Sequence, residues 1–168
     1  MIKTSRLMIQ PYDILDKNPM IELLKNPIIK QNYVIPDFSS TKECEEYFLK
    51  LLRYSHSLKH YERGIYLNQH LIGFVNDVNI ENKKIEIGYV IHPEYHQQGY
   101  ATEMLEAVII DLFNNGYEEI ICCAFESNKA SFRVMEKCHM KPMNKVADFS
   151  HQDKIQKVIY YSIKNISN

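Results

Sequence analysis

The residues best placed to do chemistry form a polar turn between an apolar strand and an amphipathic helix. The strand spans 85–91, Pro93 follows it, and the turn 96–99 (His-Gln-Gln-Gly) leads directly into the helix. Because a helix start leaves backbone N–H groups unpaired and carries partial positive charge, it suits a phosphate group. Gly99 lets the backbone approach a ligand, and Ala101 adds little side chain. Since proline ends the hydrogen-bonded edge of a strand, the sequence predicts a slot for an elongated, phosphate-bearing ligand.

Two adjacent cysteines offer a second kind of chemistry, because a thiolate is a good nucleophile. Cys122 and Cys123 stand on a predicted strand and so point to opposite faces. No histidine or helix start adjoins them to lower a thiol pKa, so a covalent acyl-cysteine route is kept only as an alternative. With Cys44 and Cys138 they lack metal-ligand spacing, and we expect reduced core or half-core residues and no metal site.

The helix after the turn is predicted from its periodicity. Its apolar residues recur at alternating steps of three and four and therefore share one face: Ala101, Met104, Leu105, Val108, Ile109, Leu112 and Phe113. Asn115-Gly116 is expected to end this helix.

The remaining elements follow from similar patterns. Ser40 precedes Glu43 at the spacing of a capping box, Asn26-Pro27 is expected to end an earlier helix, and a hairpin turn is expected at 68–70. The predicted order is a strand (4–10), helices (19–25 and 40–58), strands (64–67, 71–75 and 85–91), the helix 101–113, a strand (119–125), a helix (128–137) and two strands (143–149 and 156–163).

Composition limits the possible partners. The 168 residues carry a formal net charge of -1, so neither a nucleic-acid footprint nor a polybasic membrane patch is expected. No apolar run approaches the ~18 residues of a membrane-spanning helix, and the N-terminal residues contain no apolar signal core. We expect a single domain over residues 1–168 in a soluble, cytoplasmic protein.

Several separated motifs resemble the GNAT superfamily of acyl-CoA-dependent N-acetyltransferases: Glu86-Ile-Gly-Tyr-Val-Ile-His-Pro, His96-Gln-Gln-Gly-Tyr-Ala-Thr-Glu, Asn128-Lys-Ala-Ser and Glu136-Lys137. The opening Thr4-Ser-Arg-Leu-Met-Ile-Gln-Pro is similar to that of the RimJ/RimL-like branch, which acetylates ribosomal-protein N-termini. The resemblance implies an α/β (α+β) fold with a mixed, mostly antiparallel sheet of about six to seven strands, splayed at the cofactor slot, and about four helices on its faces. It also suggests a monomer or homodimer.

The resemblance implies acetyl-CoA as co-substrate, bound where the strands containing Val90 and Cys122 splay apart. Backbone groups at the end of the first strand would pair with the pantetheine arm, and N–H groups of the turn would hold the pyrophosphate. The implied cofactor-binding residues are Val90, Ile91, His92, Gln97, Gln98, Gly99, Tyr100, Ala101, Thr102, Asn128, Ser131 and Met135. A basic stripe of Lys129, Arg133 and Lys137 is either a contact for the 3′-phosphate of CoA or solvated surface.

Two catalytic residues are implied in the same way. Glu86 matches the strand position of a general base in this superfamily, so it would act as a base directly or through a water; the alternative is a solvated glutamate or a partner of Arg53 or Arg63. Ser131 matches a serine near the thioester sulfur and would protonate the departing thiolate; the alternative is a hydroxyl bonded to its own helix start.

The sequence departs from the family pattern in three places. Met135 stands where the family often has a tyrosine proton donor, so that role cannot be transferred to it. His96 and Gln97 alter the opening of the turn, which leaves binding through backbone N–H groups intact. His139 replaces a glycine that caps the family's helix, so we expect either a left-handed histidine or a different turn.

We therefore predict transfer of an acetyl group from acetyl-CoA to a primary amine, a protein N-terminus or a small amine, by direct attack in a ternary complex. The alternative is a non-catalytic acyl-CoA-binding or sensor module, which the missing tyrosine at Met135 favours. A Rossmann dinucleotide domain is excluded because there is no Gly-x-Gly-x-x-Gly and the hairpins imply antiparallel pairing.

Overall fold

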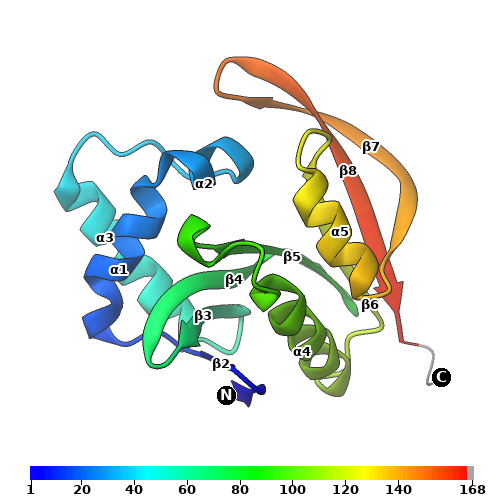
Figure 1. Cartoon of the computed structure of the whole chain (residues 1–168), viewed down its shortest axis with the longest axis horizontal. Helices are drawn as coiled ribbons and strands as arrows, with labels where there is room; N and C mark the ends of the chain where they lie inside the picture. The colour runs from blue at the N-terminus through cyan, green and yellow to red at the C-terminus, as the bar shows by residue number, and fades with distance from the viewer. Residues whose placement is uncertain (166–168) are drawn as a thin grey trace. The chain divides into compact units, whose positions relative to one another are not determined.

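The computed structural model describes residues 1–165 and divides into two compact units (Figure 1). The first unit contains Met1–Asn76 and Tyr89–Tyr100, and the second contains Asp77–Gly88 and the described part of Ala101–Asn168. The eight strands hydrogen-bond in the order β1-β2-β3-β4-β5-β6-β8-β7. The β4–β5 hairpin is divided between the units: residues 77–88 belong to the second unit and the rest of the hairpin belongs to the first.

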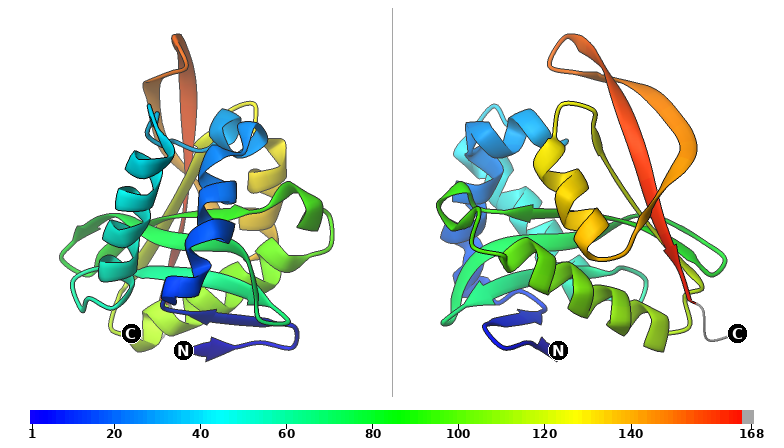
Figure 2. Two further views of the ribbon diagram at one scale, coloured as in Figure 1. Left: turned by 90° about the vertical axis from the view of Figure 1, so that its left-hand side faces the viewer. Right: turned by 45° about the vertical axis from the view of Figure 1, so that its right-hand side comes forward.

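The first unit joins the N-terminal strands to three helices. Its elements are β1 (Ile2–Lys3), β2 (Leu7–Gln10), α1 (Lys17–Lys25), α2 (Pro27–Asn32), α3 (Thr41–Ser55), β3 (Glu62–Leu67), the start of β4 (His70–Glu81) and the end of β5 (Lys84–Ile91). β2 pairs antiparallel with both β1 and β3, and α1 and α3 lie side by side (Figures 1 and 2). The core of this unit includes Met20, Leu23, Phe48, Phe74 and Val90.

Capping residues set the helix boundaries of the first unit. The Ser40 hydroxyl accepts the N–H of Glu43 at 3.2 Å, which confirms the predicted start of α3, but the Glu43 carboxylate accepts the N–H of Ser39 instead of that of Ser40. The Asn26 side chain accepts two N–H groups at the start of α2, where Pro27 occupies the first turn. Asn26-Pro27 therefore ends one helix and begins another that sequence analysis missed.

The second unit holds the remaining strands and two helices. Its elements are the rest of β4 and β5, α4 (Tyr100–Asn114) from Ala101 onward, β6 (Glu119–Phe125), α5 (Lys129–Lys137), β7 (Lys141–His151) and β8 (Lys154–Lys164). β8 pairs antiparallel with both β6 and β7, and α5 packs against β6. The long β7–β8 hairpin is seen in orange and red in Figure 2.

The key helix α4 confirms the predicted apolar face. Met104, Leu105, Val108 and Leu112 are fully buried. Gly116 ends the helix with a φ of 89°, as the N–H of the next residue reaches back to the Leu112 carbonyl at 3.2 Å.

The predicted mixed, mostly antiparallel α/β fold is confirmed, with small corrections. The structure adds β1 and α2, so the described residues form eight strands and five α-helices, where about six to seven strands and about four helices were predicted. The helix α3 ends at Ser55, three residues before the predicted end, and the strands of the last hairpin are longer than predicted. No helix in residues 1–165 is long and apolar enough to cross a membrane.

Candidate active site

The end of β5 is tightly held in the first unit. The N–H of His92 donates to the Ile72 carbonyl at 2.7 Å, and the next residue, Pro93, has no N–H with which to continue the pairing. A Cβ added to Gly73 would lie only 2.1 Å from the carbonyl oxygen of Val90, so β4 and β5 approach closely here. Val90 and His92 are thereby fixed at the point where the sequence predicted that the strand opens.

The turn after β5 is built from backbone conformations that few side chains favour. Gln97 has a φ of 60° and Gly99 a φ of 83°, both in the left-handed region. The His96 ring lies 2.8 Å, Nε2 to oxygen, from the Ile91 carbonyl, and the Gln98 side-chain amide donates to the Glu94 carbonyl at 3.1 Å. These bonds shape the turn that precedes the first residue of α4.

One arginine from the N-terminal strands also holds this turn. The Arg6 guanidinium donates from Nη1 to the carbonyl of Gln98 at 2.9 Å, and it lies 4.5 Å from the centroid of the Tyr100 ring. Sequence analysis assigned Arg6 no role, although Arg6 stands in the opening motif quoted for the family resemblance.

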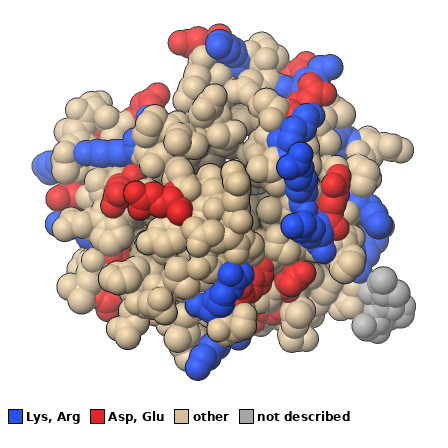
Figure 3. Space-filling view, in the orientation of Figure 1, with Lys and Arg blue, Asp and Glu red and all other residues tan. Residues whose placement is uncertain are grey.

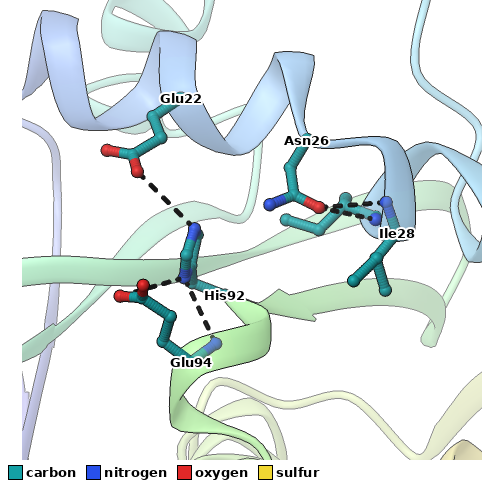
Figure 4. Close-up of polar contacts among 6 residues, drawn as sticks. Glu22, Asn26, Ile28, His92 and Glu94 are labelled. Atoms are coloured by element: carbon teal, nitrogen blue, oxygen red, sulfur yellow. Dashed lines mark hydrogen bonds and ion pairs between the residues drawn. The ribbon is translucent and has the colours of Figure 1, made fainter.

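The His92 side chain lies between two carboxylates (Figure 4). Its Nε2 is 3.7 Å from an oxygen of Glu22 on α1, and its Nδ1 is 4.0 Å from an oxygen of Glu94. The ring also packs edge-on against Tyr95. The His92 backbone therefore lies at the strand end, while its side chain contacts Glu22, Glu94 and Tyr95.

In the second unit, Glu86 lies beside a thiol. Its Oε1 accepts a hydrogen bond from the Cys123 Sγ at 3.4 Å, and Cys123 is paired with Tyr160 in the register of β6 and β8. The Lys145 ammonium lies 3.9 Å from the centroid of the Tyr160 ring. Glu86 is thus part of a polar group on one face of the sheet, and sequence analysis missed its three companions because they come from other strands.

Burial and the Glu86 charge keep the neighbouring acids protonated. Burial, followed by the charge of Glu86, raises the pKa of the Cys123 thiol to about 12. Burial likewise raises the pKa of Tyr160, with smaller contributions from Cys123 and Glu86. Burial also raises the pKa of Cys122. Neither cysteine is a thiolate near neutral pH, which argues against the covalent acyl-cysteine route.

The parallel pairing of β5 with β6 ends at the same glutamate. Lys84 to Glu86 pair with Glu119 to Ile121 in the second unit, while β6 continues to Phe125 in its ladder with β8. Glu86 therefore stands at the end of the paired segment.

Helix α5 begins with a capped turn and ends with a left-handed residue. Asn128 accepts the N–H of Ser131 at 3.2 Å, Ser131 is half-buried, and Met135 is fully buried. Among the described residues, the Ser131 hydroxyl has no hydrogen-bond partner, so it does not bond its own helix start. His139 has a φ of 63°, and the N–H of Met140 closes the helix on the Met135 carbonyl at 3.0 Å. Of the two predicted forms of this turn, the structure has the left-handed histidine.

The first turn of α4 is linked to α5 by a thiol. Cys138 donates to the carbonyl of Thr102 at 3.6 Å, and Ala101 and Thr102 are half-buried.

The basic stripe of Lys129, Arg133 and Lys137 is exposed, and basic side chains run in a line over α5 in Figure 3. Among residues 1–165, no group of three or more His, Cys, Asp or Glu side chains could hold a metal ion.

These observations can be set beside known proteins. A family model described as an acetyltransferase (GNAT) domain matches residues 6–141. The chain belongs to the GNAT acetyltransferase family. The resemblance and the N-acetyltransferase class predicted from the sequence are therefore confirmed. Comparison of the sequence with curated proteins gives no match.

Solved structures of other acetyltransferases share the fold. A GNAT-family acetyltransferase from Bacillus anthracis is 22% identical, with a TM-score of 0.82 and 97% of each chain covered. RimL, a ribosomal L7/L12 α-N-protein acetyltransferase in complex with coenzyme A, is 18% identical, with a TM-score of 0.84 over 98% of this chain and 97% of its own. Spermidine N-acetyltransferase from Vibrio cholerae, in complex with CoA and spermine, is 20% identical, with a TM-score of 0.82 over 96% of each chain.

Proposed function

We propose that this GNAT enzyme transfers the acetyl group of acetyl-CoA to a primary amine, a protein N-terminus or a small amine, by direct attack in a ternary complex. The observation that carries the proposal is the strand end and turn from Val90 to Tyr100, where proline stops the pairing and left-handed residues precede a helix start. Exposed N–H groups at such a turn suit a pyrophosphate. By their names, RimL acetylates a protein N-terminus and spermidine N-acetyltransferase acetylates a polyamine, which supports both acceptor classes.

The resemblance implies cofactor contacts within each of the two units. In the first unit, the backbone of Val90, Ile91 and His92 would pair with the pantetheine arm, and the N–H groups of 97–100 would bind the pyrophosphate. In the second unit, the implied cofactor-binding groups are the N–H groups of Ala101 and Thr102 and the residues Asn128, Ser131 and Met135. The side-chain oxygen of Asn128 already accepts the Ser131 N–H at the start of α5. The side-chain NH2 group of Asn128 is therefore the group left to bind pantetheine.

The chemistry needs one base and one acid. An ammonium has no lone pair, so the acceptor must first lose a proton, which we assign to the Glu86 carboxylate, directly or through a water. The amine nitrogen bonds to the carbonyl carbon, the carbon–sulfur bond breaks, and the nitrogen releases a second proton to solvent. The departing thiolate takes a proton from the Ser131 hydroxyl, which regains one from solvent. An N–H of Val90 or Ile91 would stabilise the oxyanion.

The test is release of free CoA thiol over a panel of peptide N-termini, polyamines, amino acids and aminosugars. We expect turnover with one class, and Glu86→Gln should lower kcat by about 100-fold with little change in the KM for acetyl-CoA. Glu81→Gln, a change at an exposed glutamate of β4, is the control and should behave as wild type. Acetyl-CoA binding without turnover on any acceptor would contradict catalysis.

The phosphate turn has its own test. Gly99→Glu would put a negative charge and a strained side chain in the turn, so CoA binding should be lost. Gly116→Glu makes the same change at another left-handed glycine, where a Cβ would meet no non-neighbouring atom of residues 1–165 within 4 Å, and should leave CoA binding intact.

A second candidate is a non-catalytic acyl-CoA-binding or sensor module. Met135, buried where the family often has its tyrosine, favours it. Tight CoA binding by calorimetry with no transfer or hydrolysis would support this candidate. For either function we propose one domain over residues 1–168, a monomer or homodimer in the cytoplasm, and neither nucleic acid nor membrane as partner.

A further inference from the structure

Arg6 is a charged residue of the first unit that the proposed chemistry leaves unused. It donates to the Gln98 carbonyl and lies over the Tyr100 ring. A Cβ added to Gly99 would lie 3.4 Å from Arg6 Nη2. One side chain from the segment before β2 therefore contacts Gln98 and Tyr100 and lies beside the Gly99 between them.

The bond to Gln98 fixes the orientation of a peptide plane. Every peptide bond of residues 1–165 is trans, so the carbonyl of Gln98 and the N–H of Gly99 point in opposite directions. Because Arg6 holds the carbonyl, the Gly99 N–H points away from Arg6. A glycine tolerates either orientation of the preceding plane, since it adopts positive and negative φ almost equally well. The turn therefore needs an external group to keep this donor in place.

We propose that Arg6 is a positioning residue for the pyrophosphate of acetyl-CoA. It keeps the Gly99 N–H turned toward the ligand, and its permanent charge lowers the cost of bringing two phosphates to the turn. Arginine suits both tasks because its planar group stacks on Tyr100 while its edge donates to Gln98. The inference rests on the proposed function and adds to it a residue that precedes the turn by more than 90 positions.

The test compares two acetyl donors, acetyl-CoA and S-acetyl-pantetheine, which lacks the pyrophosphate. Arg6→Ala should raise the KM for acetyl-CoA and weaken CoA binding by roughly 10- to 100-fold, the usual cost of losing a hydrogen bond from a charged donor. The kcat with acetyl-CoA and the kcat/KM with S-acetyl-pantetheine should not change. Arg6→Lys keeps the charge without the planar stack and should recover only part of the affinity.

Lys3→Ala is the matched control, because it removes one positive charge from the exposed neighbouring strand β1. It should leave CoA affinity unchanged. If Lys3→Ala lost as much CoA affinity as Arg6→Ala, the effect of Arg6 would come from net charge alone, and the inference would be overturned. Equal losses with both acetyl donors in Arg6→Ala would make Arg6 a structural residue only, and wild-type CoA affinity in Arg6→Ala would also refute it. Failure of the proposed function gives a different result, since wild type itself would then show no turnover with either acetyl donor. If wild type also bound no CoA, both proposals would fall.

Discussion

Gly73 tests how closely β4 and β5 must approach at the proposed cofactor edge. In Gly73→Ala, the new Cβ would lie 2.1 Å from the Val90 carbonyl oxygen and 3.1 Å from the Cα of Ile91. Atoms of this kind do not approach within 3.0 Å, and the obstacle is backbone, so the end of β5 must move by about 1 Å.

The expected loss of stability has two sources. Overpacking of this kind costs about 1–3 kcal/mol, and stretching the 2.7 Å bond from His92 N–H to the Ile72 carbonyl adds about 1 kcal/mol. A total of about 2–4 kcal/mol lowers the Tm by roughly 5–15 °C in a chain of this size. CoA affinity should fall as well, because the backbone of Val90 and His92 moves.

Thermal unfolding followed by circular dichroism and CoA binding followed by calorimetry measure the two effects. Gly116→Ala serves as control: its left-handed φ of 89° makes alanine cost about 1–2 kcal/mol, but within the described part of the chain a Cβ there has no non-neighbouring atom within 4 Å. It should destabilise the protein without weakening CoA binding. If Gly73→Ala is no less stable than Gly116→Ala and binds CoA as wild type does, the argument from close approach is wrong.

Three further predictions follow from buried polar groups. Tyr66→Phe removes the hydroxyl that donates to Asp16 at 2.5 Å, and urea unfolding should show a loss of about 1–3 kcal/mol; an unchanged midpoint would contradict this. Burial opposes ionisation of Glu119, but bonds from Lys84 and Ser162 outweigh it and lower its pKa below 4.5 in the folded state. Its contribution to stability is therefore complete above pH 4.5 and is lost as pH falls through the folded pKa, so Glu119→Gln should flatten the acid limb of a stability–pH profile. The Cys123 thiol, with a pKa raised to about 12, should react with a thiol reagent at pH 8 much more slowly in the native than in the urea-unfolded protein; equal rates would contradict its protonated, hydrogen-bonded state.

Patterns local in sequence predicted most of the elements. The apolar face of α4 and its glycine stop, the Ser40 cap of α3 and the strand β6 all depend on residues within a few positions of each other. The helix α2 carried such a signal as well, in Asn26 followed by Pro27, but the proline was interpreted only as a stop.

Contacts across the sheet could not be predicted in this way. The neighbours of Glu86 depend on which residue of β6 and β8 stands opposite, and no turn type in the sequence fixes the register of β6 against β5. Arg6 likewise reaches the turn only because the chain returns past its own N-terminal segment. The turn before α4, which depends on the local backbone, was more predictable than the groups around Glu86.

The strand order has a consequence for how the chain folds during synthesis. β8 lies between β6 and β7, although it leaves the ribosome after both. The first unit is complete once residue 100 has emerged, whereas β6 keeps an open edge until Lys154–Lys164 inserts beside it. An open edge of this kind invites association with other chains. Translation that stalls before residue 154 would therefore release a chain with one finished half and one aggregation-prone half.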